Sequence, residues 1–417
     1  MTAILNGLRA VGSGRVLDEV LTLVLDSALD VTAAERGFVM LAAPSGELEF
    51  KIGRDKGHKT LTGTSFATSD KIPREVFLTG QSRIVGDLMD GSFADAHGGT
   101  IAIGIRHVLC VPLQVGAYIG AVTTTKNIGV LYLDSRERAT MLSSATRASL
   151  EAFATQAALA IDSARLYAEA AEKAKLERDL RVAAEIQRGL LPEPQYSSAT
   201  FDIAAASIPC RTVGGDFFDY IEVGQGEFGF ALGDVAGKGP PAALLAAAVQ
   251  SNFSAHAPIA AQPADPMDRI NRALLRRAIE ARFATMCYGS LSADGRFRYS
   301  NAGQEPPVVV RAGGVMESLD MGGPVLGLLS IASYEFGEIQ LNPGDLVVMF
   351  SDGVTEARDN DNNEYERDRL LALLAGTHGS EAQRVLEDLL AAVNGFAGTA
   401  PQADDITVLV LRYRGAA

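Results

Sequence analysis

The sequence predicts an α+β protein of two domains that a charged helix connects. Over the first 166 residues, helix-like and strand-like segments follow the order helix, hairpin, helix, strands, helix. From Phe201 onward the pattern changes to many short strand-like runs with helical segments set apart from them. Many antiparallel strands with separate helices favour two packed sheets. We therefore expect residues 195–417 to form an α/β/β/α sandwich, two sheets with helices outside.

The composition is that of an ordinary globular protein. Of 417 residues, 47% are hydrophobic and 21% are charged, and the length suffices for two or three domains. The net charge of −14 makes nucleic acid and anionic membranes unfavourable partners. The longest apolar run, Ala242–Val249, is too short to span a bilayer, and the N-terminus lacks the pattern of a signal peptide. These features predict a cytoplasmic protein.

The three cysteines, Cys110, Cys210 and Cys287, are widely spaced and lie in apolar surroundings along the chain. Their spacing matches neither a zinc site nor a redox pair. We therefore expect three buried, reduced thiols.

The first domain is expected over residues 1–166. Apolar residues recur at helical spacing from Val16 to Leu29. Strand-like runs at Gly37–Ala42 and Leu48–Ile52 flank the turn Pro44-Ser45-Gly46. The remaining expected elements are a helix over Ile72–Leu78, strands over Arg83–Val85, Val108–Val115 and Ile128–Leu133, and a helix that begins near Arg147.

Four phrases in this region, AERGFVMLAAPSGELEF, RHVLCVPLQVGAYIG, IGVLYLDS and LEAFATQAALAIDSARLY, occur in an order and at spacings that resemble a GAF domain. The resemblance implies a sensor that binds a small molecule or a module that dimerises, and leaves the choice open. No convincing cyclic-nucleotide signature is present. A bilin would need a cysteine beside the pocket, whereas Cys110 lies within an apolar strand.

Residues 167–194 are expected to form a helical linker. The segment Arg165–Arg188 contains 11 charged residues in 24, and an apolar seam runs through it at spacings of 4, 3, 3 and 4: Leu176, Leu180, Ala183, Ile186 and Leu190. A solvated helix is one interpretation. Pairing with a second copy, which gives a homodimer, or docking on the next domain explains the seam better. Neither glycine nor proline occurs between Leu150 and Arg188, so a continuous helix could couple the domains as a rigid element.

In the second half, helices are expected over residues 242–255 and Pro266–Ala281, the latter with a basic face that favours either solvent or an acidic partner. Later strands and helices are expected over Thr285–Leu291, Phe297–Ser300, Val308–Arg311, Tyr334–Leu341, Leu346–Phe350, Leu370–Leu374, Val385–Phe396 and Ile406–Arg412.

The strand-like runs Phe217–Val223 and Phe228–Leu232 flank a turn centred on Gln225. Facing residues of such a hairpin have numbers that add up to 450, and Asp216 and Asp234 satisfy this sum. Their Cα atoms would lie about 4.5–5.5 Å apart. A hairpin with acidic ends and no function is the plain alternative.

Two further acids make a metal site the better interpretation. Asp352 follows the run Leu346–Phe350, and Asp404 precedes Ile406–Arg412. In antiparallel neighbours the end of one strand lies beside the start of the next, so these acids would meet. Four clustered carboxylates cannot all stay ionised without cations, and oxygen ligands suit magnesium or manganese.

Seven motifs in order resemble the type 2C metal-dependent protein phosphatases of the bacterial SpoIIE/RsbU-like subgroup: VGGDFFDY, GDVAGKGPPAALLAA, ATMCYG, NAGQEPPVVV, GGPVLGL, LVVMFSDGVTEARD and DDITVLVLR. The resemblance extends from about residue 180 to 413 and includes EIQRGLLP at Glu185–Pro192. The sequence departs from the pattern at Lys238 and at Gln304-Glu305, which leaves substrate preference open.

The resemblance implies a centre of two Mn²⁺ or Mg²⁺ ions. Its ligands would be Asp216, which would bridge the ions, together with Asp234, the Val235 carbonyl, Asp352 and Asp404. Asp405 would orient the loop, and Asp216 and Asp234 would be the catalytic carboxylates. Two cations about 3.5–4 Å apart lower the pKa of a water between them, which can then attack phosphorus. Arg211 would bind the phosphate, with packing or a surface ion pair as an equal alternative.

We therefore expect a signalling serine/threonine phosphatase, controlled by its sensor domain, that acts on a phosphorylated regulatory protein such as an anti-sigma-factor antagonist. Two other functions stay open: a phosphatase-like module that binds a partner without catalysis, and a hydrolase of small phosphate esters. An NTPase is excluded, because only three residues separate Gly233 from Gly237-Lys238 and a glycine follows the lysine.

Overall fold

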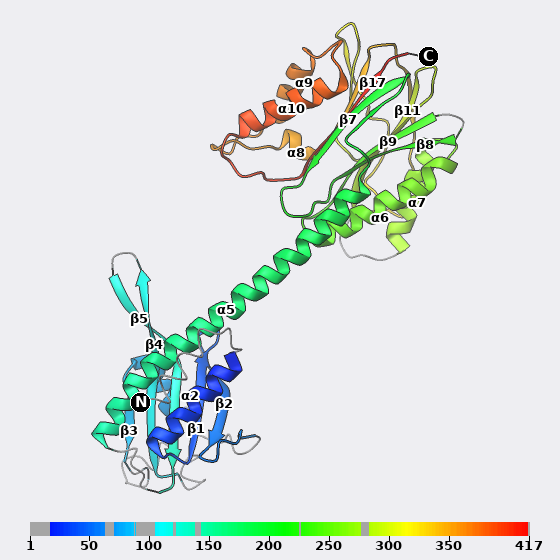
Figure 1. Ribbon diagram of the computed structural model, residues 1–417. Coiled ribbons are helices and arrows are strands. Elements are labelled where there is room, and N and C mark those ends of the chain that lie inside the picture. The colour runs from blue at the N-terminus through cyan, green and yellow to red at the C-terminus, as the bar shows by residue number, and fades with distance from the viewer. Residues whose placement is uncertain are drawn as a thin grey trace. The chain divides into compact units, whose positions relative to one another are not determined.

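Figure 1 shows the computed structural model of the chain, which divides into two compact units, residues 1–176 and 177–417. The structure describes residues 17–62, 71–86, 88, 105–119, 122–137, 143–224, 227–276 and 283–415. Within these residues, no helix has both the length and the apolar character that crossing a membrane requires.

The first unit is built on one antiparallel sheet with strand order β2-β1-β5-β4-β3. Helices α2 and α5 pack on one face of this sheet through a core that includes Leu25, Leu131 and Ile161. The other face carries α3 and a second cluster around Phe38 and Tyr132. The bounds are α2 Leu17–Thr32, β1 Arg36–Ala42, β2 Leu48–Asp55, α3 Lys71–Thr79, β3 Arg83–Val85, β4 His107–Ile119 and β5 Val122–Ser135. The expected order of elements is confirmed.

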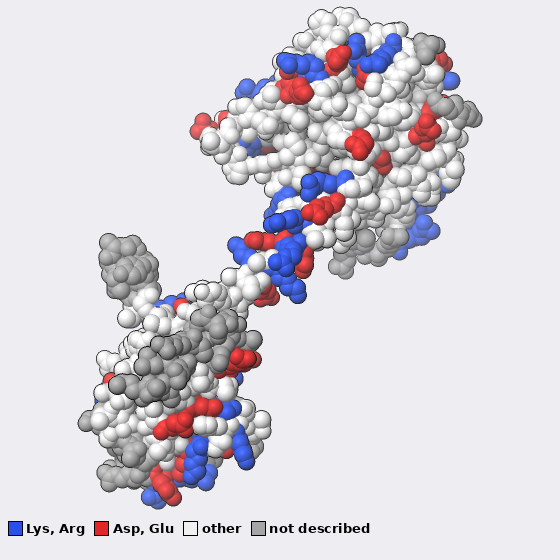
Figure 2. Space-filling model, in the orientation of Figure 1, with Lys and Arg blue, Asp and Glu red and all other residues white. Residues whose placement is uncertain are grey.

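Helix α5, Ser144–Leu190, is continuous over 47 residues, as the absence of glycine and proline predicts. Its first half is buried in the core of the first unit, whereas the apolar seam is open to solvent: Leu176 is 59% exposed and Ile186 is 63% exposed. Basic and acidic side chains alternate along the exposed stretch of the helix (Figure 2).

The second unit is a sandwich of two sheets. One sheet has the order β14-β11-β10-β9-β8, with β15 paired to β11, and the other has the order β13-β12-β16-β17-β7-β6. Phenylalanines such as Phe218, Phe230 and Phe297 fill the space between the sheets together with Val347 and Leu409. Outer clusters join α6 and α7 to the first sheet and α8 to α10 to the second. The predicted α/β/β/α layering is therefore confirmed (Figure 1).

The strands of this unit are β6 Gln195–Ser197, β7 Phe201–Ile208, β8 Phe217–Val223, β9 Glu227–Val235, β10 Ala284–Leu291, β11 Arg296–Ala302, β12 Val308–Val310, β13 Met316–Ser318, β14 Gly322–Gly323, β15 Gly337–Gln340, β16 Leu346–Phe350 and β17 Ile406–Tyr413. The helices are α6 Pro240–His256, η4 Ala257–Ile259, α7 Ala264–Arg276, α8 Asp352–Thr355, α9 Glu366–Leu374 and α10 Ala382–Ala397.

One expectation differs from the structure, and one is not fully covered by it. The strand expected over Tyr334–Leu341 is shorter, because the Tyr334 side chain packs into the core beneath α6 and α7 and the pairing with β11 starts only at Gly337. The end of the helix expected over Pro266–Ala281 lies outside the described residues, which resume at Phe283.

Candidate metal centre

The hairpin of β8 and β9 brings Asp216 and Asp234 to the same end of the first sheet. Phe217 pairs with Gly233 and Val223 with Glu227, so the numbers of facing residues add up to 450 as predicted. Asp216 comes one residue before β8, and Asp234 is the second-to-last residue of β9. The predicted register is confirmed.

Glycine at position 215 allows the backbone before Asp216 to approach β9. A Cβ atom at Gly215 would lie 2.7 Å from the Val235 carbonyl oxygen and 3.2 Å from Asp234 Oδ1. The first distance is closer than real Cβ contacts, so a larger residue would push the Asp216 segment away from β9. The Val235 carbonyl and the Asp234 carboxylate therefore lie beside the backbone that leads into Asp216.

The second sheet supplies the other two predicted ligands. Strands β16 and β17 are antiparallel, with Phe350 opposite Val408, so the segment after β16 lies beside the segment before β17. The Ser351 hydroxyl donates to the Asp405 carbonyl at 3.1 Å and accepts from the Thr407 N–H at 2.9 Å. Asp352 and Asp404 thus project from adjacent turns, as predicted.

Asp405 ties the two sheets together. It is 3% exposed, and its Oδ1 accepts the N–H of Cys210 while its Oδ2 accepts the N–H of Gly215, both at 2.7 Å. The carboxylate at the start of β17 thereby fixes the loop that leads into Asp216. This is the loop-orienting contact that the sequence predicted for Asp405.

Among the four predicted carboxylate ligands, Asp216 is the most buried. It is 4% exposed, and its Oδ2 has no hydrogen-bond partner in the described part of the chain. Burial, and then the charge of Asp234, raises the pKa of Asp216 well above its ordinary value, although the hydroxyls of Thr407 and Ser351 oppose the shift. The described residues therefore leave one oxygen of this carboxylate unsatisfied.

The neighbouring acids are under similar electrostatic pressure. Burial is the largest cause that raises the pKa of Asp234, and Asp404 and Asp405 raise it further. Burial, followed by the charges of Asp234, Glu356 and Asp404, raises the pKa of Asp352 to about 7. These mutual effects mean that Asp216, Asp234, Asp352 and Asp404 form one electrostatic cluster.

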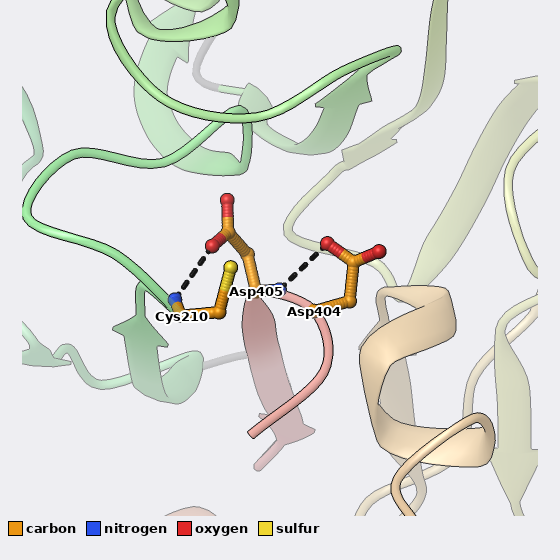
Figure 3. Close-up of side chains that lie close together, drawn as sticks. All are labelled: Cys210, Asp404 and Asp405. Carbon is orange, nitrogen blue, oxygen red and sulfur yellow. Dashed lines mark hydrogen bonds between the residues drawn. The ribbon is translucent and has the colours of Figure 1, made fainter. Parts of the chain in front are cut away.

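At one side of the cluster, ligand-type atoms of Cys210, Asp404 and Asp405 all lie within 4.8 Å of one another (Figure 3). The prediction of a buried core thiol is wrong for Cys210, which is half-buried because it lies in the loop that Asp405 holds. Burial and the contact with Asp405 raise the pKa of this thiol to about 11, so it stays protonated. Cys110 and Cys287 are buried in strands, as predicted.

Asp404 already has a cationic partner. Lys238 Nζ lies 2.8 Å from Asp404 Oδ2 and also donates to the Ala403 carbonyl. The other oxygen, Oδ1, accepts the N–H of Asp405 at 2.9 Å. Asp404 is thus satisfied within the protein, in contrast to Asp216.

Carboxylate and carbonyl oxygens at this end of the sandwich form the donor set that Mg²⁺ and Mn²⁺ prefer. The unpaired Oδ2 of Asp216 and the carbonyl of Val235 beside Gly215 suit such an ion. The residues present therefore fit a divalent metal, while the individual ligand assignments stay predictions.

Arg211 is exposed. Its Nη1 would lie 3.9 Å from a Cβ at Gly239, which places the guanidinium near the start of α6. Among the described residues it has no carboxylate partner, so the predicted alternative of a surface ion pair is not observed.

One contact with the loop before Asp216 does not follow from the residue pattern. Gln187, near the end of α5, donates to the Gly214 carbonyl at 2.7 Å and accepts the Gly214 N–H at 3.2 Å. Gln250 donates to the Leu190 carbonyl at 2.8 Å and to Asp219 Oδ2 at 3.3 Å. Gln187 lies in the motif EIQRGLLP. The resemblance of this motif to the phosphatase family was the signal in the sequence that could have pointed to the contact.

Comparison with known proteins places both domains. Residues 16–161 match the family model of the GAF domain, and residues 224–414 match that of the stage II sporulation protein E, SpoIIE. The chain is 29% identical over 245 residues to the phosphoserine phosphatase RsbU of Bacillus subtilis, covering 58% of this chain and 71% of RsbU. It is 26% identical to the protein IcfG of Synechocystis, covering 57% of this chain and 41% of IcfG, so it spans less than half of that relative.

A solved structure agrees on the fold. The SiaA-PP2C domain of Pseudomonas aeruginosa superposes with a TM-score of 0.50 at 23% identity, covering 58% of this chain and 99% of that domain. The sandwich and the matches to named phosphatases define a protein phosphatase of the PP2C class, which is a class of hydrolases. Within that class, the chain combines a GAF domain with a SpoIIE-type PP2C domain.

Proposed function

We propose that this chain is a phosphatase that hydrolyses phosphoserine or phosphothreonine on a regulatory protein with the help of two Mg²⁺ or Mn²⁺ ions. One observation carries the proposal. The Asp216 carboxylate is buried beside Asp234, and its Oδ2 has no partner among the described residues. A carboxylate in that position favours a cation, because an unpaired buried charge is strongly unfavourable.

The ions would be held by Asp216, Asp234, the Val235 carbonyl, Asp352 and Asp404. Such ions, when bound, generate a nucleophile from water and stabilise charge on the transferred phosphoryl group. The protein's part is positioning: Asp405 holds the N–H groups of Cys210 and Gly215, so the Asp216 segment is fixed before the reaction.

Arg211 would orient the substrate. Its guanidinium is exposed near the start of α6 and has no carboxylate partner in the described ranges, so its planar fork is available for two phosphate oxygens. The exposure of this side chain supports this role over a packing role.

The substrate would be a small phosphorylated regulator such as an anti-sigma-factor antagonist, in line with the name of the relative RsbU. We assign residues 1–166 to the sensor, 167–194 to the linker and 195–417 to the phosphatase domain. The sensor would respond to a small molecule or serve as a dimerising module. The exposed seam on α5, which includes Leu176 and Ile186, supports a homodimer formed through the linker.

The test is phosphate release from a panel of phosphoproteins, phosphopeptides and small phosphate esters, with Mn²⁺, Mg²⁺ or a chelator. We expect metal-dependent release from phosphoproteins, and a loss of several orders of magnitude in the Asp216→Asn variant. Asp294→Asn, in the turn between β10 and β11, is the matched control and should stay active. Preferential turnover of small phosphate esters would mean that these, and not phosphoproteins, are the substrates. Near-wild-type turnover in Asp216→Asn would refute the assigned centre.

A further inference from the structure

Lys238 lies in the loop between β9 and α6, directly after two of the predicted ligands. The flanking residues Gly237 and Gly239 have φ of +104° and +79°, a region that favours glycine. This backbone directs the lysine across to the loop before β17, where its ammonium contacts Asp404 and the Ala403 carbonyl. The contact therefore joins two loops of the same centre.

The contact uses the one oxygen of Asp404 that the backbone leaves open. Oδ1 accepts the Asp405 N–H, while Oδ2 lies 2.8 Å from Lys238 Nζ. The Lys238 and Asp404 side chains are only 35% and 31% exposed, so solvent screens the pair incompletely. A divalent ion bound to Asp404 Oδ2 would meet the ammonium at close range and be repelled by it.

We propose that Lys238 is a built-in counter-ion of Asp404, which a divalent cation must displace before Asp404 can serve as its ligand. The inference rests on the proposed function and concerns the control of the same centre. It makes the two ion positions unequal. The position at Asp216 offers an unpaired carboxylate oxygen, whereas the position at Asp404 requires an ion pair to break.

The consequence is a centre that fills in two steps. The first ion binds where the protein leaves a buried charge unsatisfied. The second binds at a higher concentration of free cation, because it competes with a tethered ammonium that is always present. The response to Mg²⁺ or Mn²⁺ would then be set by residue 238, through its contact with Asp404.

The test is direct titration of the full chain with Mn²⁺, following free Mn²⁺ by electron paramagnetic resonance and heat by calorimetry. We expect Lys238→Met to tighten the weaker site about tenfold, or to add a second bound ion, because a neighbouring positive charge is removed. Lys238→Arg keeps the charge and should bind Mn²⁺ no more tightly than the wild type. Lys238→Gln provides a second neutral variant in case the methionine disturbs the loop.

A double-mutant cycle separates displacement from a general charge effect. In an Asp404→Asn background, Lys238→Met should bring no gain in affinity, because the competing pair no longer exists. Arg211→Met removes an equal charge near the start of α6 without touching Asp404. This variant should tighten Mn²⁺ binding less than Lys238→Met does.

The outcomes are distinct. Absence of any Mn²⁺ binding by the wild type would overturn the proposed function itself. Two ions bound by the wild type, with unchanged or weaker binding in both neutral variants, would overturn the displacement of Lys238 and leave the function intact. An equal gain in the Asp404→Asn background would also overturn it.

Discussion

Gln187, near the C-terminal end of α5, exchanges two hydrogen bonds with the backbone of Gly214, two residues before Asp216. Gly214 is packed closely on its other side, since a Cβ there would lie 2.5 Å from Asp405 Oδ2. The loop that carries Asp216 is thus held between the linker helix and the start of β17. A shift of the end of α5 would therefore reach the predicted metal centre through these two hydrogen bonds.

Replacing Gln187 with alanine should release that loop. The change leaves a backbone N–H and C=O of Gly214 without their partners, which costs about 1–3 kcal/mol when such groups are buried. We expect weaker Mn²⁺ binding and at least a several-fold loss of phosphate release. Glu185→Ala, an exposed residue in the same turn of α5, is the control and should leave both quantities unchanged. Equal Mn²⁺ affinity in the two variants would show that Gln187 does not support the loop that carries Asp216.

Asp352 should make the stability of the metal-free protein depend on pH. Its pKa rises from 3.8 to about 7, through burial and then the charges of Asp234, Glu356 and Asp404, so the folded state binds this proton more tightly than the unfolded state. The stability that this group adds is fully present below about pH 3.8 and is lost as the pH rises through about 7.

Asp352→Asn should therefore raise the thermal midpoint of the chelator-treated protein at pH 8 and hardly change it at pH 4. Thermal unfolding at both pH values measures the effect, with Asp294→Asn as a control that gains nothing. The same Asp352→Asn variant should lose phosphate release by several orders of magnitude. A variant no more stable than the wild type at pH 8 would show that the acids do not repel one another.

The apolar seam on α5 should support a homodimer. Leu180→Glu with Leu190→Glu places charges on the seam and should dissociate the dimer at micromolar concentration, as measured by light scattering. Arg178→Gln with Arg181→Gln changes the net charge by the same amount on the opposite side of the helix and should leave the dimer intact. A wild-type protein that is monomeric under these conditions would mean that the seam docks within one chain.

Coupling along α5 should depend on helical phase. Inserting two residues near Lys175 rotates the two ends of the helix by about 200° relative to each other, whereas inserting seven nearly restores the phase. We expect the first insertion to change basal phosphate release strongly and the second to preserve most of it. Equal activity in both insertions and in a flexible-linker replacement would leave the GAF domain as a tether or dimeriser.

Local pattern predicted most of this architecture. The register of β8 and β9 follows from the short spacing between two strand-like runs in the sequence, and the approach of Asp352 to the β17 start follows from two apolar strands with acids at their ends. Contacts over long distances in sequence were out of reach. The bond from Gln187 to Gly214 joins residues 27 apart through a side chain and a backbone, and no periodicity encodes such a pair.

The misjudged elements have a similar cause. Cys210 follows the apolar pair Ile208-Pro209 in sequence, yet Asp405, 195 residues later, holds its backbone beside the acids. Tyr334 is typical of a strand, but its ring fills a gap beneath α6 and α7 and shortens β15. In both cases a tertiary partner outweighed the local preference.

Helix α5 contributes to two separate hydrophobic cores. Leu150 and Ile161 are buried in the first unit, and Ala184 packs with Val213 and Ala243 in the second, while the stretch between them is almost entirely open to solvent. Gene recombination that exchanged the sensor would therefore preserve both cores only if its breakpoints fell within this open stretch. If the ends of the helix must also keep their phase, functional junctions would differ in length by whole heptads. The helix would then allow different sensor domains to be joined to the same catalytic domain.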